Sequence, residues 1–162
     1  MRYVIKQKVF TLTDDFVIHD MDGNPRYHVK GKLLSLGDRL SFRTLSGEEV
    51  VTIRQKLLSF SPRYRIYRRG VLQAEVKKRK FTLLRDKFKV NMKDGTPDLE
   101  ITGNLLDHNY RIERQGREVA RVSKTWITVR DSYGADVAPG EDDVFILACV
   151  VVVDMISHGS SS

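Results

Sequence analysis

A run of thirteen residues near the C-terminus, residues 144–156, constrains the fold more than any other part of this 162-residue chain. Every residue of the run is apolar except Asp154. A helix of this length spans roughly 20 Å, whereas the hydrocarbon core of a bilayer is about 30 Å thick. A helix that is apolar on every face must be buried on all sides. We therefore favour a helix over residues 142–157 that the rest of the protein encloses.

Two other interpretations of this run are open. The β-branched residues 150–153 favour a central strand, and an apolar C-terminal segment is also compatible with a membrane tail. Asp142 and Asp143 suit a helix N-terminus, and Gly159 suits the residue after a helix end. Cys149 is the only cysteine and lies inside the run, so we expect a buried, inert thiol in a reducing, intracellular setting.

The chain before this run repeats a hairpin pattern. Five glycines in turn-forming sequences recur at intervals of 24, 23, 25 and 21 residues: Gly23, Gly47, Gly70, Gly95 and Gly116. Six positions after each glycine comes a β-branched aliphatic residue: Val29, Ile53, Val76, Ile101 and Val122. An alternating apolar pair precedes each glycine, beginning with Phe16 and Ile18. Alternation on both sides of a turn predicts antiparallel hairpins with these apolar residues on the inner face.

The predicted fold class is mainly β, an antiparallel closed barrel of about twelve strands that encloses a hydrophobic C-terminal helix. Five hairpins, an N-terminal strand near residues 6–12 and a sixth half-unit with Ile127, Val129 and Gly134 supply the strands. A twisted sheet of this size tends to close on itself. We expect one domain over residues 1–158 and a frayed tail at 159–162. The N-terminus has no continuous apolar segment, so we expect no signal peptide.

Positive charge is concentrated in one part of the chain. Residues 26–93 contain 19 Lys and Arg but 5 Asp and Glu, a formal charge of +14, whereas the remainder carries −7. Alternation places these candidate anion-binding residues on the outer surface: Lys30, Lys32, Arg43, Arg54, Lys56, Arg63, Arg65, Lys77, Arg79, Lys87 and Lys89. Such rows suit phosphate groups of lipids or nucleic acid, and they equally suit solvated strand faces. Few aromatic residues interleave with them, which makes nucleic acid the weaker choice.

No motif indicates catalysis. The histidines are scattered and lack metal-ligand spacing: His19, His28, His108 and His158. Residues 107–109 are typical of a turn, and the adjacent carboxylates at 14–15 and 141–143 suit capping or solubility. Asp154 suits a position near the barrel mouth, bonded to the backbone or to a basic partner. We therefore expect a non-enzymatic protein without catalytic residues, metal or cofactor.

Several short segments, in order and spacing, resemble the LURP-one-related family over almost the whole chain. They are FVIHD (16–20) with Gly23, YHVKG (27–31), DRL (38–40) with Gly47, IRQK (53–56), SPRYRIY (61–67), ARVSKTW (120–126), DSYG (131–134) and VVVVD (150–154). The resemblance implies the fold of the tubby C-terminal domain and the phospholipid scramblases, a twelve-stranded barrel around a central C-terminal helix. Tubby-type members bind phosphoinositide headgroups through basic surface residues, and scramblases act at membranes. Many LURP-one-related proteins have no established activity.

From the charge pattern we expect a binding or adaptor module that docks reversibly on anionic phospholipid headgroups, or on another phosphorylated ligand, through its basic outer surface. The alternative is a regulator or adaptor that binds an acidic protein or nucleic acid. We expect a cytoplasmic protein that is peripheral at the membrane and has no transmembrane segment, because residues 144–156 fill the barrel.

Overall fold

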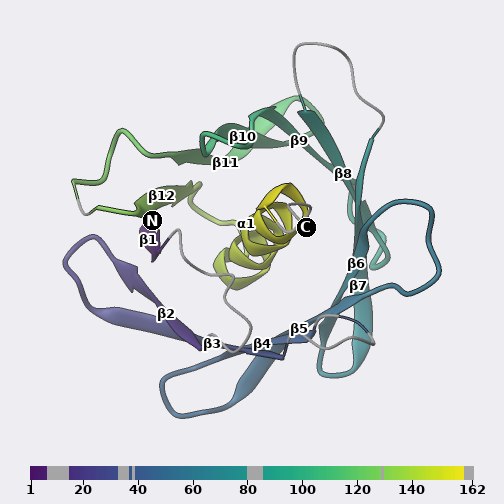
Figure 1. Ribbon diagram of the computed structural model, residues 1–162, viewed down its shortest axis with the longest axis horizontal. Coiled ribbons are helices and arrows are strands. Elements are labelled where there is room, and N and C mark those ends of the chain that lie inside the picture. Colours follow the sequence, from purple (N-terminus) through teal and green to yellow (C-terminus); the bar gives the residue numbers. More distant parts are fainter. Residues whose placement is uncertain (7–14, 33–36, 38, 80–85, 129, 159–162) are drawn as a thin grey trace.

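Twelve antiparallel strands form a closed barrel, and the single helix of the described chain lies across its middle (Figure 1). This computed structural model describes residues 1–6, 15–32, 37, 39–79, 86–128 and 130–158. The strands are β1 Arg2–Lys6, β2 Phe16–Asp20, β3 Pro25–Lys32, β4 Arg39–Arg43, β5 Glu49–Gln55, β6 Arg63–Arg68, β7 Val71–Lys78, β8 Asp86–Met92, β9 Leu99–Asn104, β10 Asn109–Arg114, β11 Arg117–Ser123 and β12 Ser132–Val137. The helix is α1 Asp143–His158. The predicted fold class is confirmed.

Each strand pairs with its neighbours in the sequence, and β1 pairs with β12 to close the barrel. The predicted hairpins are β2–β3, β4–β5, β6–β7, β8–β9 and β10–β11. Their turn glycines have φ between +76° and +91°, a left-handed conformation that other residues adopt only with strain. The glycine spacing therefore marked the hairpin turns correctly.

The predicted alternation separates an inner from an outer face. The five β-branched residues that follow the glycines, from Val29 to Val122, are all fully buried. Ile18 is also fully buried, whereas Phe16 is only partly buried at the barrel rim. One face of each strand therefore points at the helix, and the other faces solvent.

Helix α1 supplies the centre of the core. Its residues 145–156 are all buried, which confirms the helical interpretation and replaces the strand and membrane-tail alternatives. Burial against the barrel overrides the strand preference of valines 150–153. Asp142 caps the helix, because its Oδ1 accepts a hydrogen bond from the Phe145 N–H at 3.2 Å. Among the described residues, no helix has the length and apolar character needed to cross a bilayer.

Charged groups fix the start of α1 against the barrel wall. Glu141 lies 2.6 Å from Arg114 Nη1 and 3.0 Å from Arg117 Nη2, and the Tyr3 hydroxyl donates a hydrogen bond to Asp143. Capping by this carboxylate run agrees with the prediction, whereas its contacts with Arg114, Arg117 and Tyr3 were not predicted. Cys149 is fully buried, and burial raises the pKa of its thiol. Residue 14 and Gly159 lie outside the described residues.

The two ends of the barrel sequence differ from the predicted hairpin pattern. The first described strand is β1 at Arg2–Lys6, where Tyr3 and Ile5 point inward. The strand predicted near residues 6–12 falls mostly on residues 7–14, which lie outside the described part of the chain. The last strand, β12, begins at Ser132 rather than near Ile127. Gly134 is a strand residue there, and a Cβ at this position would lie 3.2 Å from the Trp126 ring. Residue 129 is not described.

The buried position of α1 predicts a large effect of cavity formation. Leu147→Ala should lower the free energy of unfolding by about 2–5 kcal/mol, because Leu147 is fully buried among apolar side chains. Leu45→Ala is the matched control: Leu45 is 55% exposed in a turn, and its loss should change stability by less than about 0.5 kcal/mol. Urea denaturation measures both, and equal values would contradict the buried position of α1.

Candidate functional site

Eight of the predicted cationic residues form one continuous patch on the outside of β5–β8, which we call the basic face. It consists of Arg54, Lys56, Arg63, Arg65, Lys77, Arg79, Lys87 and Lys89. The register makes it continuous: Arg54 lies opposite Arg65, Arg63 opposite Lys77, and Lys77 opposite Lys89. Backbone hydrogen bonds from Lys56 to Arg63 and from Arg79 to Lys87 extend it beyond the strand ends.

Like charges lie directly across from one another on the basic face. Two rows cross the strands, one from Arg54 to Arg65 and one from Arg63 through Lys77 to Lys89. Like charges on directly opposed strand residues destabilise a sheet. The free protein therefore carries electrostatic repulsion at this surface that a bound anion would relieve.

Glu75 on β7 is the counter-charge at the centre of the basic face. One of its carboxylate oxygens lies 3.3 Å from Arg63 Nη1, and the other lies 3.3 Å from Arg65 Nε and 3.8 Å from Lys56 Nζ. Partial burial opposes ionisation of Glu75, but the hydrogen bond from Arg65 and the three nearby cations hold its pKa below the ordinary value. One carboxylate therefore neutralises part of the charge of three cations, and the basic face keeps an excess of positive charge.

The β7–β8 side of the basic face is less neutralised. Lys89 pairs with Asp98 at 3.2 Å. Within the described part of the chain, Lys77, Arg79 and Lys87 have no ion-pair partner. Arg79, Lys87 and Lys89 line a hollow of about 60 Å³. Glu100 and Thr102 line its other side. Several cationic donors around a hollow of this kind suit the oxygens of a phosphate group.

Three predicted residues are not among these eight. Arg43 is near the β4–β5 turn, where Glu49 pairs with it at 3.3 Å. Lys30 is exposed on β3, opposite Ser41. Lys32 is the last residue of β3 and lies opposite Arg39 of β4. The prediction missed Arg39, which is exposed on β4 and lies opposite Arg54. Because Leu40 points inward, the alternation along the strand places its neighbour Arg39 on the outer surface, so the sequence could have identified it.

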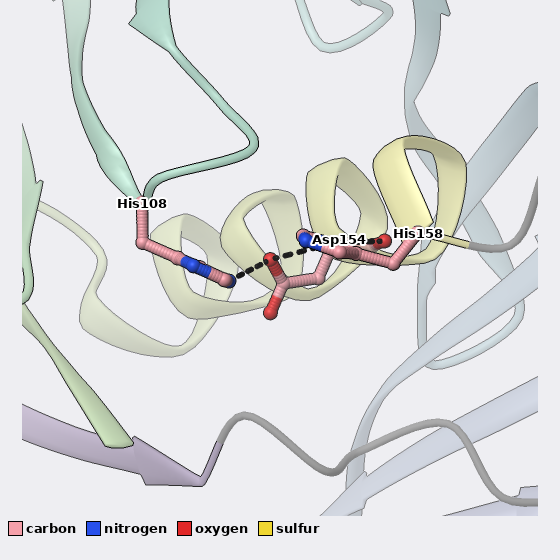
Figure 2. A group of neighbouring side chains, drawn as sticks. All are labelled: His108, Asp154 and His158. Carbon is pink, nitrogen blue, oxygen red and sulfur yellow. Dashed lines mark hydrogen bonds and ion pairs between the residues drawn. The ribbon is translucent and has the colours of Figure 1, made fainter. Parts of the chain in front are cut away.

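A buried polar cluster lies inside the barrel, near the C-terminal end of α1 (Figure 2). His108 comes from the connection between β9 and β10, and Asp154 and His158 come from successive turns of α1. His108 Nε2 lies 2.9 Å from Asp154 Oδ1, at ion-pair distance but without the alignment of a hydrogen bond. The Tyr133 hydroxyl donates a hydrogen bond to Asp154 Oδ2. Asp154 therefore contacts both a basic and a phenolic partner. Such partners are needed because a buried carboxylate without them would be costly.

Aromatic stacking completes this cluster. The His108 ring stacks on Tyr133 with centroids 4.2 Å apart and on His158 with centroids 5.0 Å apart. Burial and the charge of Asp154 raise the pKa of the Tyr133 hydroxyl, which stays protonated and able to donate. Residues 107–109 lie at a chain reversal, as predicted, but no pattern in the sequence indicated that the His108 ring is fully buried against the helix.

The same cluster offers a donor set for a divalent cation. One ligand atom each from His108, Asp154 and His158 lies within 4.8 Å of the others, and two imidazoles with one carboxylate are common ligands of Zn²⁺ and Fe²⁺. Sequence spacing missed this set because His108 is 46 residues from Asp154. Of the buried polar atoms in this cluster, Asp154 Oδ2 accepts a hydrogen bond from Tyr133, whereas Asp154 Oδ1 and both ring nitrogens of His108 have no hydrogen-bond partner among the described residues. Because Asp154 also lies at ion-pair distance from His108, we interpret the cluster as a polar tie between α1 and the barrel wall.

This interpretation predicts that Asp154 contributes strongly to stability. Asp154→Ala should lower the free energy of unfolding by about 3 kcal/mol or more, because it leaves the buried Tyr133 hydroxyl without its acceptor and the buried His108 ring without the carboxylate beside it. Asp136→Ala is the control, since it removes an exposed ion pair with Arg2 that contributes about 1 kcal/mol or less. Chemical denaturation measures both. A stabilisation of the parent protein by Zn²⁺ that Asp154→Ala abolishes would instead identify a metal site.

Comparison with known proteins agrees with the fold and leaves the role of these sites open. The family model described as LURP-one-related matches residues 1–154. The uncharacterized protein YxjI of Bacillus subtilis is 36% identical over 154 residues, which cover 95% of this chain and 92% of the relative. The crystal structure of the Arabidopsis thaliana protein AT5G01750 superposes with a TM-score of 0.71 at 25% identity, over 96% of this chain and 90% of that one. This chain belongs to the LURP-one-related family.

Proposed function

We propose that this protein is a non-enzymatic module that docks reversibly on anionic phospholipid surfaces through the basic face. The observation that carries the proposal is the opposition of like charges across β5–β8, between Arg54 and Arg65 and between Lys77 and its two neighbours. Cations that serve only solubility need not lie directly opposite one another, because like charges on opposed strand residues destabilise the sheet. Phosphate groups that bridge the rows would turn this repulsion into attraction.

Two features favour lipid headgroups over nucleic acid as the source of these phosphates. The aromatic residue within the basic face, Tyr67, is covered by Arg54, whose guanidinium carbon lies 5.2 Å from the ring centroid. It is therefore not presented for stacking with bases. The face also lies on a convex barrel wall, which suits contact with an extended surface. An acidic protein partner is the alternative, and vesicle co-sedimentation separates it from lipid.

The proposal predicts opposite effects of one substitution on stability and on binding. Lys77→Glu should raise the free energy of unfolding by about 0.2–1 kcal/mol, because it places an acid between Arg63 and Lys89. The same change should weaken binding to vesicles containing phosphatidylserine roughly tenfold. Lys93→Glu changes the net charge equally but lies in the β8–β9 turn, so its binding should stay close to that of the parent protein.

Co-sedimentation with vesicles of pure phosphatidylcholine or with added phosphatidylserine, at low and raised salt, measures this binding. The proposal requires salt-sensitive recovery with the anionic vesicles. Recovery in the supernatant under every condition would refute it. Salt-sensitive retardation of DNA or RNA without vesicle binding would assign the basic face to nucleic acid, and pull-down of an acidic protein without vesicle binding would support the adaptor alternative.

A further inference from the structure

The connection between β5 and β6 presents large apolar side chains to solvent beside the basic face. Leu57 is 54% exposed, whereas Leu58 and Phe60 are as exposed as in an extended chain, at 105% and 114%. Isolated surface leucines are ordinary, but three large apolar residues within four positions form a local apolar patch. We propose that residues 57–60, which we call the apolar tip, insert into the interfacial region of an anionic membrane when the basic face docks.

The apolar tip is a structured loop. The Lys56 N–H donates a hydrogen bond to the Arg63 carbonyl at 2.8 Å and closes its base, and the Ser59 hydroxyl donates to the Ser61 carbonyl at 2.5 Å. Leu58 has φ +59°, a left-handed conformation that is unusual for leucine. A strained backbone that directs an apolar side chain into solvent indicates a binding role, since folding alone gains nothing from it.

Cations flank the apolar tip on both sides. Lys56 precedes it and Arg63 follows it, and both contact Glu75 in the basic face. The next outward-facing residues on these two strands are Arg54 on β5 and Arg65 on β6, which lie opposite each other. Apolar residues bordered by lysine and arginine are the arrangement that binds at a membrane interface, where the apolar groups enter the acyl boundary and the cations contact headgroups.

The sequence contains related patterns elsewhere. A lysine followed by apolar residues occurs at Lys56-Leu57-Leu58, and the sequence has the same order at residues 32–34 and at residues 80–81. Leu57 lies close to Gly37, since a Cβ at that glycine would lie 3.0 Å from Leu57 Cδ2. The apolar tip is thus one occurrence of a pattern that the sequence repeats after strands of the basic half.

This inference rests on the proposed docking function, and a probe of insertion depth separates the two. Cys149 is fully buried, so a cysteine introduced at Phe60→Cys can be labelled selectively with the fluorophore NBD. With phosphatidylserine vesicles, NBD at position 60 should shift to the blue and be quenched by lipids that carry a nitroxide on the upper acyl chain. Ser46→Cys is the control, because the β4–β5 turn lies at the opposite end of the strands and should show no shift.

A paired substitution tests the contribution of the apolar side chains. Leu58→Ser combined with Phe60→Ser should lower the vesicle partition coefficient by about tenfold or more at raised salt. Leu45→Ser removes a leucine that is 55% exposed at the opposite end of the strands, and it should leave the partition coefficient unchanged. Both sites are exposed, so folding should be retained, which circular dichroism checks.

Three outcomes would overturn the insertion. Vesicle binding without any change at position 60 would leave headgroup docking in place but exclude insertion. Absence of vesicle binding by the parent protein would remove both proposals together. Self-association in analytical ultracentrifugation that Leu58→Ser with Phe60→Ser abolishes, without an effect on vesicle binding, would assign the apolar tip to a contact between copies of the chain.

Discussion

The enclosure of a helix that is apolar on almost every face is the constraint on which this structure depends. Residues 145–156 of α1 are buried on every face, and no single sheet face could cover them. A closed barrel solves this problem and leaves no unpaired sheet edge. It also provides a largely apolar inner surface, because one residue in two along each strand points at the helix. Core and barrel therefore depend on one another for burial.

The interior and the outer surface of the barrel consequently have different roles. The interior contains the polar tie between Asp154, His108 and Tyr133, which fixes the C-terminal end of α1 to the wall. The exterior of β5–β8 is free to carry charges that the fold does not need. The opposed cationic rows and the apolar tip lie on this exterior. Binding at the barrel surface, with α1 retained in the core, is the functional arrangement that these features support.

The sequence could predict what depends on local periodicity. Glycine spacing located the hairpin turns, and alternation separated inner residues such as Val76 from outer ones such as Lys77. Features set by tertiary geometry were missed. The register shift between Phe42 and Arg43 places Arg43 opposite Glu49, with which it forms an ion pair. Contact between His108 and Asp154 arises only when the barrel closes, so no spacing rule identifies it.

Hydrogen exchange with and without anionic vesicles tests most directly whether the surface binds while the core stays closed. In the free protein, the amides of α1 should exchange only through global unfolding. Addition of phosphatidylserine vesicles should slow exchange in residues 56–63 and leave α1 unchanged. Faster exchange in α1 on vesicle binding would show that the helix leaves the barrel, and this would contradict binding through the outer surface of an intact barrel.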